Sequence, residues 1–203
     1  VGNIVCIIMA TLINNLIKET TGNGLNFFSA ELWLSGTIVA MLLFRLFSLD
    51  RLVPTAFVGM IGAGLAVWYS FGQFQAIEAD QSIVFFGGML RQDLFSIYFR
   101  IFLSLFLILT IALTVLTGIP DNEDAPDFYS LLFGATIGMM LMASANNLLI
   151  LFLGVEMASV PSYVMVGFLK GRKSSSEASL KYVVYGAGAA GVMLYGISLV
   201  AGV

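Results

Sequence analysis

This sequence of 203 residues contains six long apolar segments, which restrict the folds that it can adopt. Each is close to the length of about 20 residues that an α-helix needs to cross a hydrocarbon layer about 30 Å thick. Lipid offers no hydrogen-bond partners to a backbone, so such segments must be helices that pair their own peptide groups. The sequence therefore predicts an all-α membrane protein. The expected spans are Leu25–Phe47, Val53–Phe71, Asp93–Leu116, Ala125–Ala145, Asn147–Leu169 and Ser176–Gly202.

Composition agrees with a membrane location and limits the chemistry. Hydrophobic residues make up 59% of the chain and charged residues only 10%, against about 25% charged in soluble domains. The net charge of −3 gives no sign of nucleic-acid binding. Cys6 is the single cysteine and histidine is absent, so no disulfide and no Cys/His cluster for zinc, haem or an iron–sulfur centre is expected. Proton transfer would have to use Glu, Asp or Lys.

The first 24 residues form a separate, uncertain apolar segment. Asn3, Asn14 and Asn15 interrupt it, and it could be a signal-like segment, an interfacial helix or a shortened span. The sequence begins at Val1 rather than Met and ends as the last helix finishes. We expect the chain to be a fragment of a longer protein, with residues 25–203 forming its membrane helices.

Basic residues in short loops predict the orientation. The loops after the first, third and fifth spans would lie on one side and carry Arg45, Arg51, Lys170, Arg172 and Lys173, whereas the other side has only Lys18 and Arg91. The first group is therefore predicted to be cytoplasmic. The acidic loop 121–127 falls on the same side, but acidic residues carry little weight in this rule.

Glu156 is the strongest candidate for a functional residue. It lies near the middle of the span Asn147–Leu169, roughly 14 Å from one end, with Pro161 five residues later. A carboxylate at that depth costs about 2.5–3.5 kcal/mol or more. Pro161 has no N–H, which leaves the carbonyl of Met157 without its helical donor, and Ser159 and Ser162 add hydroxyls. Glu156 either handles protons or is a protonated group that only holds neighbouring helices together.

Lys181 is the second intramembrane candidate, about five residues into the span Ser176–Gly202. One interpretation is that it reaches the interface or pairs with Glu177 one turn earlier. The other is that Lys181 passes protons to or from the region of Glu156, because burial lowers the pKa of a lysine and raises that of a glutamate.

Three further charged residues favour a structural interpretation. Glu31 and Asp93 stand at helix starts, where capping and the helix dipole favour an acid, and Arg100 is expected to reach back to the interface. The segment Gly186–Gly191 (GAGAAG) matches GxGxxG literally. A dinucleotide site needs a preceding strand and turn, so we interpret these small residues as a place of close helix approach instead.

Two stretches resemble subunit N of bacterial NADH-quinone oxidoreductase (respiratory complex I). They are FYSLLFGATIGMMLMASANNLLILFLGVEMASVPSYVMVGFLKG and SSSEASLKYVVYGAGAAGVMLYGISLVAG, and GGMLRQDLFSIYF fits the same family. The resemblance runs from about Asn26 to the end of the chain. Residues 1–24 have no clear counterpart in it.

The resemblance implies the first part of an antiporter-like fold of about fourteen helices. It implies that the glutamate at Glu156 faces a lysine on a later, broken helix in a proton-pumping pair, with Lys181 on the same polar path. It also implies a multi-pass subunit of a translocase in the cell inner membrane, with no redox catalysis in this chain. NAD, FMN, iron–sulfur clusters and quinone would belong to partner subunits, and the partners would be other membrane subunits of complex I and the lipid bilayer.

Two alternatives remain open. The chain could belong to a related cation/proton antiporter or membrane-bound hydrogenase, or it could be a purely structural membrane subunit. The proton-handling interpretation predicts that Glu156 is buried in the bundle. Because Pro161 has no N–H to donate, we also predict a bend or a break in hydrogen bonding around Met157–Pro161.

Overall fold

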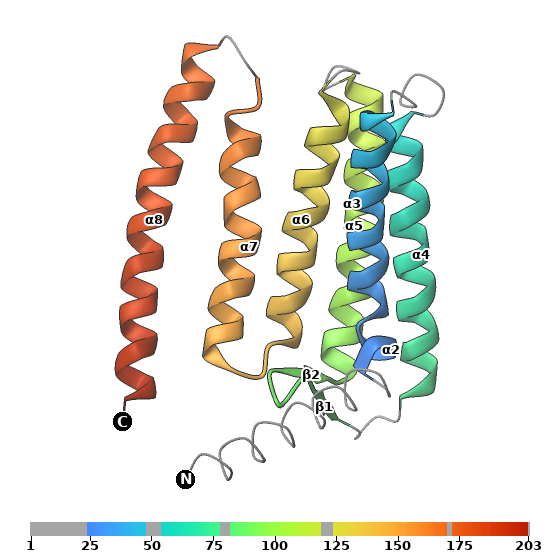
Figure 1. The fold of residues 1–203 in the computed structure, drawn as a ribbon, viewed down its shortest axis with the longest axis vertical. Coiled ribbons are helices and arrows are strands. Elements are labelled where there is room, and N and C mark those ends of the chain that lie inside the picture. The colour runs from blue at the N-terminus through green and yellow to red at the C-terminus, as the bar shows by residue number, and fades with distance from the viewer. Residues whose placement is uncertain (1–23, 48–53, 78–81, 119–123, 170–171, 203) are drawn as a thin grey trace, which may run out of the picture.

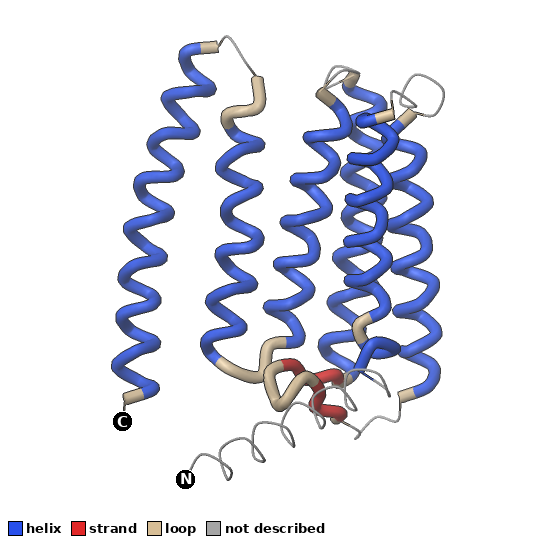
Figure 2. Tube along the Cα trace, viewed as in Figure 1, coloured by secondary structure: helices blue, strands red, loops and turns tan. Residues whose placement is uncertain are grey.

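The computed structural model describes residues 24–47, 54–77, 82–118, 124–169 and 172–202, and it is almost entirely helical (Figures 1 and 2). Six of its helices are long and apolar enough to cross a membrane. They run alternately up and down beside one another (Figure 1). Their bounds are α3 (Ser29–Leu46), α4 (Thr55–Ala76), α5 (Leu94–Thr117), α6 (Ala125–Ser144), α7 (Leu148–Val166) and α8 (Lys173–Ala201).

The six predicted spans are confirmed, and their ends differ from the prediction by a few residues, with α7 ending at Val166 and α8 beginning at Lys173. The first span is divided, because a single turn, α2 (Leu25–Phe27), precedes α3 and Phe28 lies outside the helical backbone. The second span continues to Ala76 rather than ending at Phe71. Residues 1–23 lie outside the described part of the chain, so the expectations for the N-terminal segment and Cys6 stay predictions.

Helices α3 to α6 form a four-helix group that contains the apolar core. Small residues of α3 and α4, among them Ala30, Ala63 and Ala66, let these helices approach each other, and Phe133 and Met140 of α6 fill the centre. Gly62 lies so close to α3 that a Cβ added there would be 2.1 Å from Oγ1 of Thr37. The group is thus packed tightly enough to hold buried polar side chains in fixed positions.

A short β-hairpin covers one end of this group and was not predicted from the sequence. Strands β1 (Ile83–Phe85) and β2 (Leu90–Gln92) pair in an antiparallel register that sets Val84 opposite Arg91. Gly87 and Gly88 take positive φ values of 63° and 87° in the turn, where a side chain would be strained. The hairpin touches the α6–α7 turn, since the backbone N–H of Asn146 donates to the carbonyl of Met89 at 3.0 Å.

The helix ends bear out the predicted grouping of the loops. Because the helices alternate in direction, the ends of α3, α5 and α7 lie at the end of the bundle opposite the hairpin (Figure 1). Arg45 forms an ion pair with Asp127 there, joining α3 to the start of α6. Arg172 and Lys173 begin α8 at the same end. Arg51 and Lys170 lie outside the described residues, and the assignment of this end to the cytoplasm stays a prediction.

Helices α7 and α8 stand beside the four-helix group rather than within it (Figure 1). Gly154 is the one buried residue of α7 among those described, and no described residue of α8 is buried. Gly186 packs against Tyr163, because a Cβ added at Gly186 would lie 2.1 Å from the tyrosine hydroxyl. Gly188 and Gly191 face open space. The predicted close helix approach at the GAGAAG segment is therefore confirmed at its first glycine only.

Candidate functional site

Helix α7 places Glu156 near the middle of a membrane span. The side chain of Asn147 begins the helix by accepting hydrogen bonds from the backbone N–H groups of Leu149 and Ile150, at 2.6 and 3.3 Å. The helix then runs without interruption to Val166. Glu156 is half-buried. The prediction that Glu156 is predominantly buried rather than facing lipid concerns the complete assembly, so it stays a prediction.

No hydrogen bond or ion pair joins Glu156 to another residue in the described part of the chain. The two nearby serines are occupied elsewhere: the hydroxyl of Ser159 donates to the carbonyl of Val155 at 2.7 Å, and that of Ser162 donates to the carbonyl of Ser159 at 2.6 Å. An isolated carboxyl at this depth must stay neutral or find a partner. Within the described residues, Glu156 therefore has no polar partner.

Pro161 lies inside α7 and does not divide it. Its ring faces α6, since a Cβ added at Gly134 would lie 3.8 Å from Cγ of Pro161. The missing N–H still removes the usual donor to the carbonyl of Met157. The predicted bend or break in hydrogen bonding around Met157–Pro161 stays a prediction.

Two glycines bring α6 and α7 into backbone contact beside Glu156. A Cβ added at Gly138 would lie 2.6 Å from the backbone nitrogen of Ala158, and one added at Gly154 would lie 3.1 Å from the carbonyl oxygen of Gly138. Such small-residue contacts replace the hydrophobic driving force that helices lack in lipid. The position of Glu156 therefore depends on how closely α6 and α7 pack.

Gly138→Ala is expected to push α6 and α7 apart and to destabilise the protein by about 1–3 kcal/mol, because the clash is with backbone atoms that cannot rotate away. Gly134→Ala is the matched control one turn earlier on α6, where the nearest atom would lie at an ordinary 3.8 Å. Thermal denaturation of the assembled protein in detergent compares the two. Equal midpoints would show that the α6–α7 contact does not fix the helices.

The structure places Lys181 on the exposed side of α8. Its Nζ lies 2.6 Å from Oε1 of Glu177, one turn earlier, and the two side chains are 65% and 66% exposed. The local pairing considered from the sequence is therefore confirmed. The structure does not bring Lys181 and Glu156 into contact, so the role of Lys181 in a proton path stays a prediction.

Asp93 caps α5 as predicted. Its side chain accepts from the backbone N–H of Ser96 at 2.8 Å, and the hydroxyl of Ser96 accepts from the backbone N–H of Asp93 at 3.1 Å. This reciprocal arrangement is a capping box. Asp93 is thus a structural residue that fixes where α5 begins.

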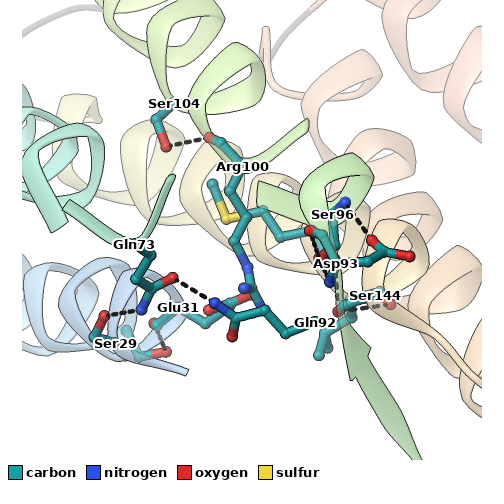
Figure 3. Close-up of polar contacts among 12 residues, drawn as sticks. Ser29, Glu31, Gln73, Gln92, Asp93, Ser96, Arg100, Ser104 and Ser144 are labelled. Carbon is teal, nitrogen blue, oxygen red and sulfur yellow. Dashed lines mark hydrogen bonds and ion pairs between the residues drawn. The ribbon is translucent and has the colours of Figure 1, made fainter. Parts of the chain in front are cut away.

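The predicted position of Glu31 at a helix start is confirmed, whereas the interface interpretation of Arg100 is wrong. Both side chains are fully buried, and Nε of Arg100 donates to Oε1 of Glu31 at 2.7 Å (Figure 3). Arg100 does not reach back to the helix end because Glu31, in the first turn of α3, offers a closer partner inside the bundle. A sequence signal existed: Ser96, Arg100 and Ser104 recur at four-residue spacing and so share one face of α5.

No group of three or more His, Cys, Asp or Glu residues that could hold a metal ion lies in the described ranges. Amide and serine side chains near the hairpin form further polar contacts. Nε2 of Gln73 donates to the carbonyl of Asn26 and to Oγ of Ser29, at 2.6 and 3.0 Å, and Nε2 of Gln92 donates to Oε1 of Gln73 at 3.2 Å (Figure 3). These bonds join α3, α4 and β2.

Comparison with known proteins agrees with this geometry. Residues 145–203, which include Glu156 and Lys181, match the family of NADH:quinone oxidoreductase/Mrp antiporter transmembrane proteins. The chain is 38% identical to NADH-quinone oxidoreductase subunit N 2 of Chloroherpeton thalassium, over 92% of this chain and 37% of that protein. It is 38% identical to NADH-quinone oxidoreductase subunit N of an Anaeromyxobacter species, over 92% of this chain and 36% of that protein.

A solved structure shows the same arrangement of helices. A chain in the structure of respiratory complex I from Thermus thermophilus with bound aureothin superposes with a TM-score of 0.68 at 26% identity, covering 85% of this chain and 36% of that chain. The fold is that of an antiporter-like, multi-pass membrane subunit. The chain is similar to NADH-quinone oxidoreductase subunit N along most of its length, and it spans little more than a third of the length of the relatives it matches.

Proposed function

We propose that this chain is part of the proton-translocating membrane subunit of an NADH-quinone oxidoreductase, a translocase that couples quinone reduction to proton transport. The observation that carries the proposal is Glu156, a carboxyl near the middle of a 19-residue apolar helix with no ion-pair partner in the described residues. An ionisable residue at that depth is rare unless it serves ion movement. The matched relatives supply the class of reaction.

The proposed chemistry is the uptake and release of a proton by the Glu156 carboxyl. An opposite charge close to the carboxyl would favour its ionised form, and removal of that charge would favour the protonated form. A lysine on a later helix of the family fold, outside the six spans of this chain, is the proposed partner. Electron transfer in other subunits would change the distance or charge of that partner and so drive the proton on or off.

The proposed assembly follows from the same relatives. Other membrane subunits of the complex would cover the exposed sides of α7 and α8, in the inner membrane of the cell. NAD, FMN, iron–sulfur clusters and quinone would be bound by partner subunits, and redox catalysis would take place outside this chain. This proposal matches the low charge of the chain and its many exposed apolar side chains.

A cation/proton antiporter is the second candidate, because the matching family includes the Mrp antiporters. Proton transport measured in membrane vesicles that contain the complete assembly distinguishes the two candidate functions. A redox-driven pump acidifies the vesicle interior when NADH is added in sodium-free medium. Proton movement that is independent of NADH and requires a sodium gradient would contradict the proposal and support the antiporter function.

Lys181→Ala is expected to reduce the rate of proton transport by less than about tenfold, because water can reach an exposed lysine and replace it in part. Lys173→Ala, at the start of the same helix, is the matched control and should leave transport unchanged. NADH-driven acidification of vesicles measures both. Transport abolished by Lys181→Ala in an assembled complex would show that Lys181 is indispensable and that the exposed pair with Glu177 is not its working state.

A further inference from the structure

The ion pair between Glu31 and Arg100 leaves most of its hydrogen-bonding capacity unused. It is made through Nε of Arg100 and Oε1 of Glu31, whereas Nη1 and Nη2 of Arg100 and Oε2 of Glu31 have no partner among the described residues. Both side chains are completely shielded from solvent. Guanidinium and carboxylate groups usually meet in a forked pair that satisfies two donors and two acceptors at once. The single hydrogen bond between Glu31 and Arg100 indicates that another molecule binds the remaining donor and acceptor atoms of the pair.

The charges at the site restrict what that molecule can be. Glu31 and Arg100 together carry no net charge, so an anion would be repelled by Oε2 and a cation by the Nη groups. The unused atoms comprise two donor groups and one acceptor. Their partner must therefore be neutral, small, and able both to donate and to accept hydrogen bonds.

Neighbouring buried groups have the same unused capacity. Oε1 of Gln92 and Oγ of Ser70 also lack partners within the described ranges, and both residues are buried. Gln92 stands at the end of β2 and Ser70 in α4, one turn before Gln73. The bonds of Gln73 to Gln92 and Ser29 connect this end of the bundle beneath the hairpin (Figure 3). The unused polar atoms thus come from four elements around the end of the bundle that the hairpin covers.

We propose that the Glu31–Arg100 pair is a binding site for water molecules enclosed within the four-helix group. Water is neutral, donates to Oε2 and accepts from both Nη groups, and buried waters commonly join polar groups that have no protein partner. The hairpin and the Gln73–Gln92 bond close the site at the end of the bundle that carries few basic residues.

The test is a structure of the complete membrane complex at a resolution that shows ordered water. The expected result is density within hydrogen-bonding distance of both Nη groups of Arg100 and of Oε2 of Glu31. The double variant Glu31→Leu/Arg100→Met, which removes both charges at similar side-chain volume, should keep the helices in place and lose this density. Nη groups bonded directly to protein oxygen atoms, or an empty site in the wild type, would overturn the proposal.

A solution measurement provides a second test that does not depend on map quality. The infrared band of Arg100, assigned from the difference between wild type and Arg100→Lys, should shift after transfer of the complex to D2O well before the slowest backbone amides exchange. Enclosed water that exchanges with the solvent would carry the deuterons to the guanidinium. A band that shifts only together with the slowest amides shows a dry ion pair and would also overturn the proposal.

Discussion

Arg100→Met is expected to lower the free energy of unfolding by about 3–5 kcal/mol, because it leaves the carboxylate of Glu31 buried without its cation. Methionine is flexible and similar in volume to arginine, so loss of packing contributes less than loss of the charge. Thermal denaturation of the assembled complex in detergent, together with the amount of complex recovered from membranes, measures the effect.

Two controls separate the lost charge from other causes. Arg91→Met makes the same change at an arginine that is half exposed on the hairpin and 3.7 Å from Asp93, and should cost less than about 1 kcal/mol. Glu31→Leu/Arg100→Met removes both charges and should recover most of the lost stability. A single variant as stable as the wild type would show that Glu31 is neutral in the folded protein or has another partner.

Glu156→Gln is expected to preserve assembly and to lower the rate of proton transport by about tenfold or more, since a positioned proton-transfer group contributes about 10²–10⁴-fold. Glutamine keeps the shape and hydrogen-bonding capacity of the side chain but cannot release a proton. The half-buried site tolerates the change because no described residue depends on the charge of Glu156. NADH-driven proton uptake and quinone reduction are measured on the same vesicles.

Glu177→Gln is the matched control for this variant. Glu177 is 66% exposed on α8, so the same chemical change there should leave transport close to that of the wild type. A fall in transport with Glu177→Gln, and none with Glu156→Gln, would show that protons pass through the Glu177–Lys181 pair on α8 rather than through Glu156 on α7. Loss of the assembled complex with Glu156→Gln would instead favour the structural interpretation of the glutamate.

The spans could be predicted from the sequence because apolar length is a local property. In lipid, a long apolar segment must be helical to pair its own backbone hydrogen bonds. The positions of α3 to α8 can therefore be predicted without knowing which segments pack against them. The pair of Lys181 and Glu177 was foreseen for the same reason, since residues four apart on a helix are neighbours. The hairpin was missed because each strand has only three residues, too few to show an alternating pattern.

The contact between Glu31 and Arg100 required three-dimensional information. The two residues are 69 positions apart, and each alone resembles an ordinary charge near a helix start. Only the packing of both helices against α4 and α6 shows that the two side chains are buried. For Glu156 the sequence supplies the depth in the membrane, and the structure adds the close contact of Gly138 with α7 that holds the helix in place. The proposed charged partner of the Glu156 carboxyl lies outside the residues that the structure describes.

The most direct test of a proton-handling Glu156 is an infrared difference spectrum of the complete complex before and after NADH is added. The account predicts a change in the carboxyl C=O band during turnover that is present in the wild type and in Glu177→Gln and absent in Glu156→Gln. That result would show that Glu156 itself gains or loses a proton when electrons flow. Identical difference spectra for the wild type and an assembled Glu156→Gln complex would contradict the account.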